Sequence, residues 1–240
     1  MSLLVVDQVI KRFRGLTAVD GASFQVGAGE IFAVIGPNGA GKTTLFNLIA
    51  GVFAPDAGAI SFEGTRIDGL APDAICRLGI GRTFQLVRPF PALTVEDNAL
   101  IGALLRRPSV AAARAHAHDV LRRLDLYDKR HQLASALTLP DRKRLEVARA
   151  LATDPKLLLL DEVMAGLRPA ETDRMVAILR TLNRESGITI LLIEHVMRAV
   201  MALAARVLVL HHGAAIAEGT PETVVRDQAV IDSYLGAEAL

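Results

Sequence analysis

The sequence of 240 residues has little cysteine and no long apolar run. Cys76 is the one cysteine, which excludes a disulfide within the chain and a cysteine-rich metal site. The longest apolar runs, Ile188–Ile193 and Ala199–Ala205, are far shorter than the ~20 residues that a membrane-spanning helix needs. Met1–Val6 is apolar but lacks a basic leader and is followed by Asp7, which argues against a signal peptide. We therefore expect a chain that does not cross a membrane.

An excess of either charge is also missing. Lys and Arg total 27 against 26 Asp and Glu, a formal net charge of +1. Proteins that coat nucleic acid usually carry a clear basic excess, so we expect no nucleic-acid partner. Hydrophobic residues make up 51% and charged residues 22%, which is typical of a globular chain with a large core. Lysine is scarce, and each lysine is worth locating: Lys11, Lys42, Lys129, Lys143 and Lys156.

What the sequence does contain is a series of short apolar runs that predict buried strands. These runs are Ile31–Ile35, Leu157–Leu160, Ile188–Ile193 and Val207–Leu210. They are continuous rather than alternating, and the first three lead through a turn into a helical pattern. This combination predicts an α/β fold with a mostly parallel sheet. The first 26 residues and Ala59–Phe62 alternate more, as the strands of an additional antiparallel sheet would.

A helical segment interrupts this α/β pattern. Between about residues 90 and 152 strand-like runs disappear, and Ala, Leu and Arg dominate. Val110–Leu126 carries apolar residues at helical spacing. We interpret residues 1–240 as one domain, with a core of 1–89 and 153–240 and a helical subdomain of about 90–152.

The loop after the first buried run matches the phosphate-binding motif G-x-x-x-x-G-K-S/T in full. Its glycines let backbone N–H groups turn toward anionic phosphates, and the helix that follows adds the partial positive charge of its N-terminus. Lys42 is expected to reach the β- and γ-phosphates, and the Thr43 hydroxyl to ligate Mg²⁺. The predicted nucleotide-binding residues are Gly36, Pro37, Asn38, Gly39, Ala40, Gly41, Lys42, Thr43 and Thr44.

A second motif supplies carboxylates. The apolar run Leu157–Leu160 ends in Asp161 and Glu162. Asp161 can reach the shell of a bound Mg²⁺, and Glu162 can orient and deprotonate a water molecule. The two motifs together predict Mg²⁺-dependent nucleotide binding, with hydrolysis if Glu162 points at the γ-phosphate.

Further motifs come in a fixed order along the chain. Gln85 ends Gly81–Gln85 before the helical segment, Leu137–Asp141 precedes an Arg-rich helix at Arg142–Leu151, and His195 follows the third apolar run. Together with the phosphate and carboxylate motifs, this order resembles the ATPase subunits of ABC transporters over essentially the whole chain. The resemblance implies a P-loop NTPase core with an antiparallel β subdomain and a helical subdomain, and ATP and Mg²⁺ as cofactors.

The resemblance also implies roles for single residues. Gln85 would contact Mg²⁺ or the attacking water, and His195 would hydrogen-bond the γ-phosphate and hold that water with Glu162. Phe13 would stack on adenine, although a core position in a strand is an alternative for it. The signature residues would contact ATP bound to a second ATPase subunit, and they are Thr138, Leu139, Pro140 and Asp141.

The signature departs from the Leu-Ser-x-Gly-Gln that is usual in the family. Pro140 lacks an N–H at the glycine position, and Asp141 adds a negative charge at the glutamine position. These departures predict a weakened ATP site on the partner, and they favour a paralogous partner with an intact signature. The alternative is a tolerated local variant in which Asp141 caps the helix.

The subfamily that the sequence resembles is the ATPase subunit of branched-chain amino-acid importers. Gly81–Gln85, Leu93–Asn98 and the tail from Glu218 to Gly236 carry this resemblance. It implies a peripheral position at the cytoplasmic face of the inner membrane. The implied partners are transmembrane permease subunits, a second ATPase subunit, identical or paralogous, and a substrate-binding protein. The permease is expected to contact the surface around Arg88 and Phe90, although packing between the subdomains is an alternative for these residues.

Two other classes stay open on the residues alone. An ATPase of iron–sulfur assembly has a similar length, and a P-loop kinase or GTPase would share the phosphate motif. The helical segment, Gln85 and His195 have no evident reason in a kinase or GTPase. Co-purification with a multi-helix membrane protein would separate a transporter subunit from these alternatives.

Overall fold

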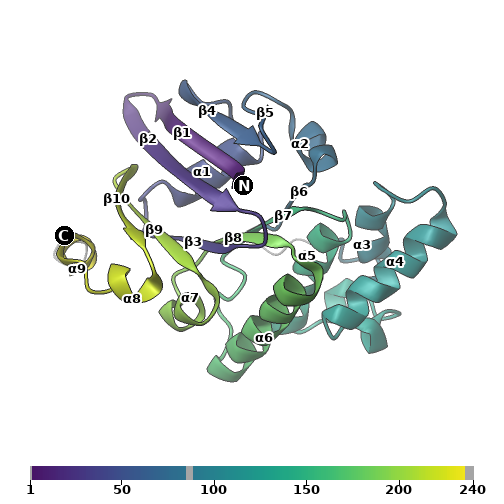
Figure 1. The fold of residues 1–240 in the computed structure, drawn as a ribbon. Coiled ribbons are helices and arrows are strands. Elements are labelled where there is room, and N and C mark those ends of the chain that lie inside the picture. Colours follow the sequence, from purple (N-terminus) through teal and green to yellow (C-terminus); the bar gives the residue numbers. More distant parts are fainter. Residues whose placement is uncertain (1, 85–88, 236–240) are drawn as a thin grey trace.

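The larger of two sheets forms the centre of the fold (Figure 1). The computed structural model describes residues 2–84 and 89–235. The strand order of this six-stranded sheet is β10-β9-β3-β8-β7-β6. Its strands are β3 (Ile31–Ile35), β6 (Ile80–Arg82), β7 (Leu157–Asp161), β8 (Thr189–Ile193), β9 (Arg206–His211) and β10 (Ala214–Gly219). All pairings are parallel except that of β10 with β9, which confirms the predicted mostly parallel sheet.

The continuous apolar runs become strands that are buried on both faces. Every residue of β3, β7 and β8 is buried. Alternate side chains of a strand point to opposite faces, so β3 feeds two apolar clusters. Ile31, Ala33 and Ile35 belong to one cluster, and Phe32 and Val34 to the other.

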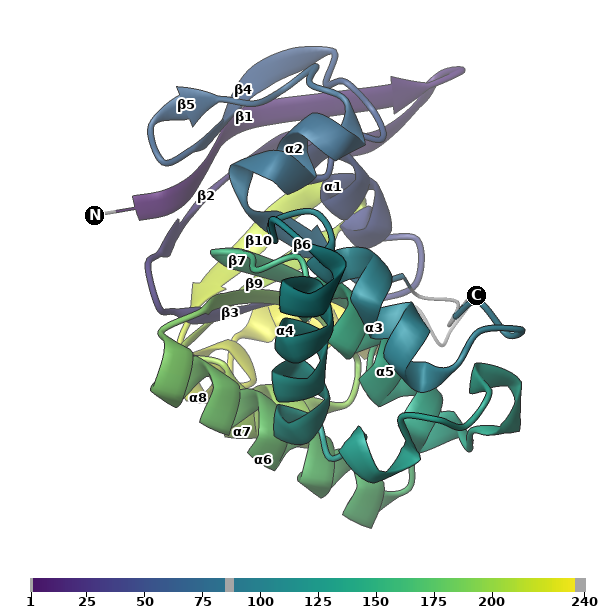
Figure 2. The ribbon, with the colours of Figure 1, turned by 90° about the vertical axis from the view of Figure 1, so that its right-hand side faces the viewer.

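The smaller sheet is antiparallel, as its alternating sequence predicts. Its strand order is β2-β1-β4-β5, and the strands are β1 (Ser2–Phe13), β2 (Leu16–Gly27), β4 (Ala57–Phe62) and β5 (Thr65–Arg66). Helix α1 (Lys42–Ile49) lies between the two sheets, and α2 (Pro72–Leu78) lies beside α1 (Figure 2). Side chains of both sheets and of α1 share one apolar cluster.

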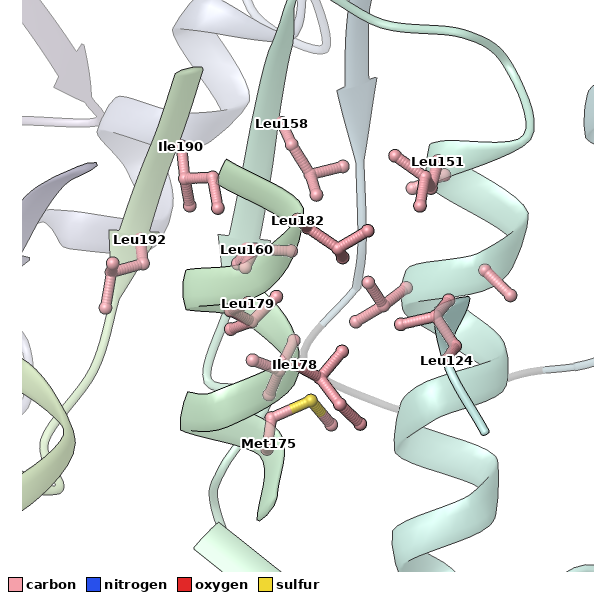
Figure 3. Close-up of a cluster of buried hydrophobic side chains, with 14 of the residues drawn as sticks. Leu124, Leu151, Leu158, Leu160, Met175, Ile178, Leu179, Leu182, Ile190 and Leu192 are labelled. Atoms are coloured by element: carbon pink, nitrogen blue, oxygen red, sulfur yellow. The ribbon is translucent and has the colours of Figure 1, made fainter. Parts of the chain in front are cut away.

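The remaining helices cover the other face and one end of the large sheet. These are α3 (Val95–Ala103), α4 (Val110–Arg123), the 3₁₀ turns η1 (Tyr127–Lys129) and η2 (Ala134–Ala136), α5 (Leu139–Leu151), α6 (Pro169–Ser186), α7 (Met197–Leu203), α8 (Pro221–Val224) and α9 (Gln228–Leu235). Figure 3 shows Leu158 and Leu160 of β7 facing Leu179 and Leu182 of α6. Side chains of α3, α4 and α5 belong to the same apolar cluster, so the helices between residues 90 and 152 share their core with the sheet.

Two predicted helix limits are wrong. Helix α4 ends at Arg123 rather than continuing to Leu126, and Asp125 takes a left-handed backbone with φ of 53°. Helix α5 begins at Leu139 rather than Arg142, because the Thr138 side chain caps it. In residues 2–84 and 89–235, no helix is both long enough and apolar enough to span a bilayer.

Candidate nucleotide-binding site

Glycine is required by packing in the loop between β3 and α1. Gly36 and Gly41 have φ of 147° and 101°, which other residues rarely adopt. A Cβ at Gly36 would lie 2.1 Å from the carbonyl oxygen of Leu210, and one at Gly41 would lie 2.2 Å from that of Ala18. The loop therefore runs directly against the backbone of β9 and β2 and cannot carry side chains at these positions.

Lys42 begins α1 and points back over this loop. Its side chain is buried, and Nζ donates hydrogen bonds to the carbonyl oxygens of Gly36 at 2.7 Å and Pro37 at 2.9 Å. Burial lowers the pKa of Lys42, while Glu162 and Asp161 oppose that shift. The N-terminus of α1 has neither a side-chain cap nor an acidic residue in its first turn. Its N–H groups and the ammonium together form a site suited to phosphate.

A pocket of about 540 Å³ opens at this loop. It is lined by Phe13, Leu16, Thr17, Ala18, Asn38, Gly39, Ala40, Gly41, Lys42, Thr43, Thr44, Glu162 and His212. Phe13 is 38% exposed, so it is not the core residue of the alternative interpretation. Its ring packs edge-on against Phe53 with centroids 5.2 Å apart, and Phe13 is one of the residues that line the pocket.

Thr17, Ala18 and His212, part of the rim of the pocket, were not predicted from the sequence. His212 lies in the β9–β10 turn, and the next residue, Gly213, donates its N–H to the carbonyl oxygen of Ala40 at 3.0 Å. Gly213 indicates a turn in the sequence. No local sequence pattern, however, predicts that this turn lies beside the phosphate loop, which is far away along the chain. Thr17 and Ala18 reach the rim in the same way, through β2.

Asp161 ends β7 and is 1% exposed. Nη2 of Arg82 lies 3.3 Å from Oδ2 of Asp161. Oδ1 is buried and has no hydrogen-bond partner within the described part of the chain. Burial raises the pKa of Asp161, and the Arg82 guanidinium opposes that shift. A buried carboxylate oxygen without a partner and the Thr43 hydroxyl in the pocket lining suit a hard cation such as Mg²⁺.

Glu162 directly follows β7, and His195 is the second residue after the neighbouring strand β8, so the two meet at one edge of the sheet. Nδ1 of His195 lies 3.8 Å from Oε1 of Glu162, and both side chains are partly exposed. The backbone N–H of Glu162 donates to the carbonyl oxygen of Ile193 at 3.0 Å. The structure thus brings Lys42 and Glu162 together in the pocket lining, and it places His195, which is not among the lining residues, beside Glu162. Gln85 lies outside the described residues.

The signature residues start α5, with Thr138 as the N-cap. The Thr138 hydroxyl donates to Oδ2 of Asp141 at 2.8 Å. Asp141 is 2% exposed and forms ion pairs with Lys129 and Arg144. The expectation that Asp141 is the N-cap is therefore wrong, because Thr138 holds that position. Pro140 lies in the first turn, where its missing N–H removes no intrahelical hydrogen bond.

Burial alone would raise the pKa of Asp141. Hydrogen bonds from Lys129 and Thr138 and the charge of Arg144 outweigh that effect and hold the pKa below its usual range. The carboxylate is thus ionised and neutralised within this subunit. Among the described residues that line the pocket, none belongs to 138–141, so the signature does not face the pocket of its own chain.

Comparison with known proteins supplies the family context. Residues 19–165 match a family described as ABC transporter, and residues 216–239 match one described as branched-chain amino acid ATP-binding cassette transporter. The high-affinity branched-chain amino acid transport ATP-binding protein LivG of Salmonella typhimurium is 39% identical, and BraF of Pseudomonas aeruginosa is 38% identical, each over 98% of both chains. The lipopolysaccharide export system ATP-binding protein LptB of Escherichia coli is 35% identical over 99% of both chains.

A solved structure has the same fold. The crystal structure of the ADP conformation of an ATP-binding cassette of an ABC transporter superposes with a TM-score of 0.90 and 32% sequence identity. The match covers 98% of this chain and 99% of that chain. The similarity thus includes both sheets and the helices between residues 90 and 152.

We expect Lys42→Ala to weaken binding of ATP–Mg²⁺ by about 10- to 100-fold, because a charge-assisted contact with phosphate is lost. Equilibrium titration measures this. Lys156→Ala is the matched control, since Lys156 is exposed and pairs with Glu63 away from the pocket. Unchanged affinity in Lys42→Ala would remove the assignment of this loop to phosphate.

Asp141→Asn should lower the free energy of unfolding by about 3 kcal/mol, because it leaves the Arg144 and Lys129 charges without their carboxylate. Urea unfolding at pH 7 measures the loss, with Asp128→Asn on the exposed neighbouring turn as control. The pKa of Asp141 is depressed, so its contribution is present above the unfolded value of about 3.9 and disappears as pH falls below it. A stability difference that persists unchanged in acid would contradict this account.

Proposed function

Since this chain belongs to the ABC transporter family of ATPases, we propose that it is the ATP-hydrolysing subunit of a branched-chain amino-acid importer. One observation carries the catalytic part of the proposal: Lys42 and Glu162 line one pocket, and His195 lies 3.8 Å from Glu162. The similarity to LivG and BraF supports the substrate class.

The proposed ATP position is based on the pocket lining. The β- and γ-phosphates would bind the N-terminus of α1 and the Lys42 ammonium, and adenine would stack on the exposed ring of Phe13. Thr43 and Asp161 would hold Mg²⁺, with Gln85 as a further ligand. The cation supplies positive charge against the phosphate oxygens.

Hydrolysis then depends on residues of this chain. The Glu162 carboxylate would accept a proton from a water molecule that attacks the γ-phosphorus, and the bond to the β–γ bridging oxygen would break to release ADP and phosphate. His195 would orient that water from the end of the neighbouring strand. The position of Glu162 in the pocket lining supports this role, as does the short distance to His195.

The substrate class is the part of the proposal that depends most on relatives. LptB, an export protein, is 35% identical, so similarity of the scaffold alone does not determine the cargo. LivG and BraF are more similar, and residues 216–239 match the branched-chain amino acid family. The permease and a substrate-binding protein would contact the amino acid. The same matches to transport proteins disfavour an iron–sulfur assembly ATPase and a P-loop kinase or GTPase.

A second ATPase subunit completes the proposed site. The α5 N-terminus with Thr138, Leu139 and Pro140 would face ATP on the partner. Asp141 is neutralised by Lys129 and Arg144, so it would bring no uncompensated charge to that contact. This favours a tolerated variant of the signature over an impaired one, and either an identical or a paralogous subunit could serve.

An apolar groove of about 370 Å³ is the proposed docking site for the permease at the cytoplasmic face of the membrane. It lies between α2, β6, α3 and α5, and Val52, Phe84 and Ile101 expose apolar surface along it. Phe90 is also exposed, with its ring 4.8 Å from the guanidinium of Arg149, a groove residue. A partner helix with an apolar face suits such a surface. Arg88 lies outside the described residues.

Glu162→Gln should keep ATP binding but hydrolyse ATP about 10²–10⁴-fold more slowly, because the general base is lost. Steady-state phosphate release measures this, with Glu171→Gln on α6 as a control for a carboxylate outside the pocket. The variant should also accumulate an ATP-held dimer, whose mass distinguishes an identical from a paralogous partner. Turnover near the wild-type rate would remove Glu162 as the base.

Cys76 is half-buried in the groove and allows a direct test of docking. Maleimide labelling of Cys76 should be slowed when the chain is assembled with its permease, because the partner covers the thiol. A Cys76→Ser chain carrying Asp128→Cys is the control, since Asp128 is exposed and lies away from the groove. Equal labelling of Cys76 in the free and assembled chain would place the permease elsewhere.

A further inference from the structure

The backbone of Glu162 is in a conformation that needs support. Its φ is 50°, in the left-handed region that only glycine adopts freely. Such a residue is strained and persists only where the surrounding structure holds it in place. The neighbours that hold Glu162 are therefore of interest for its role as the base.

Hydrogen bonds from two elements fix this segment. The Glu162 N–H donates to the carbonyl oxygen of Ile193 at 3.0 Å, which ties it to β8. Lys143 Nζ donates to the Glu162 carbonyl oxygen at 2.8 Å, which ties it to α5. The N–H of Met164 donates to Oε1 of Glu194 at 2.9 Å. The peptide groups on both sides of Glu162 thus have assigned partners.

Lys143 is an unusual residue for this place. It is 5% exposed, although it belongs to a helix whose neighbouring Arg142 is exposed. Burial lowers the pKa of Lys143, and the carboxylates of Glu194 and Glu162 are the chief groups that oppose the shift. A buried ammonium is costly unless it is paired, and here the Glu162 carbonyl oxygen and the nearby carboxylates of Glu194 and Glu162 offset that cost.

Glu194, the residue after β8, holds the backbone that follows Glu162 through the Met164 N–H. It is 1% exposed, and its Oε2 has no hydrogen-bond partner within residues 2–84 and 89–235. Burial raises its pKa to about 7, while the Met164 N–H and Lys143 favour the ionised form. Its chain neighbour is His195, so one short segment carries both the water-orienting histidine and the support of the segment after Glu162.

We propose that Lys143 and Glu194 are positioning residues that hold Glu162 in its left-handed conformation. Lys143 belongs to α5, whose N-terminus carries the signature. Lys143 therefore links the helix that begins at the signature to the backbone of the proposed base. The inference rests on the proposed role of Glu162 as the base.

The test combines hydrolysis kinetics with amide hydrogen exchange in the full chain. Lys143→Met and Glu194→Met each remove one polar contact while keeping the side-chain length. We expect kcat to fall by about 10- to 100-fold with KM for ATP unchanged, as misplacement of a catalytic group predicts. Exchange of the Met164 amide should become faster in both variants. Glu194→Gln keeps the acceptor for Met164 and should restore its protection, and Arg142→Met is the matched control on the exposed side of α5.

Wild-type kcat in Lys143→Met, or a raised KM with wild-type kcat, would overturn the proposal. Protection of Met164 that is unchanged in Glu194→Met would overturn it as well. If Lys143→Met does not fold, the Glu194 variants test the proposal: Glu194→Met should lose kcat and the protection of the Met164 amide, and Glu194→Gln should restore that protection. A failure of the base assignment is distinguishable, because Glu162→Gln would then hydrolyse ATP at the wild-type rate whatever the Lys143 and Glu194 variants do.

Discussion

The hydrogen-bond register of three buried parallel strands is the constraint on which the site depends. Ile193 of β8 pairs with Val34 of β3 and with Asp161 of β7, so the three strands end level. Parallel strands place the loops at their carboxyl ends along one edge of the sheet. The phosphate loop, the Asp161–Glu162 pair and His195 therefore meet there, although long segments separate them in sequence.

Local patterns predicted most of this arrangement. Continuous apolar runs identify strands buried on both faces, and the phosphate loop is a local motif whose backbone function is contained in its own residues. The rim formed by His212 and Thr17 could not be predicted, because only tertiary packing brings β2 and the β9–β10 turn to the loop. The burial of Asp141 could not be predicted either, since one of its two cationic partners, Lys129, comes from a different turn.

At the edge of the sheet, cationic side chains in or near the core lie beside a carboxylate or a carbonyl oxygen. Arg82 lies beside Asp161, and Lys143 lies beside the Glu162 carbonyl, with the Glu194 carboxylate as a further neighbour. Ion pairs of this kind contribute little net stability compared with apolar side chains of similar volume. They do provide polar groups whose orientation is fixed before substrate binds, which is the condition for electrostatic catalysis. Electrostatic support of ATP hydrolysis therefore explains the presence of these charged residues better than a contribution to the stability of the fold does.

The order of the large sheet has a consequence for synthesis of the chain. Strand β3 is made early, but its two neighbours, β8 and β9, lie between Thr189 and His211. At about 5–20 residues per second, the ribosome needs roughly 8–30 s to reach them after β3 has emerged. During that time the sequence Ile-Phe-Ala-Val-Ile of β3 has both edges unpaired, a state that favours aggregation. In a nascent chain of this topology, α1, the antiparallel sheet or a chaperone therefore has to cover β3 until β8 and β9 have been synthesised.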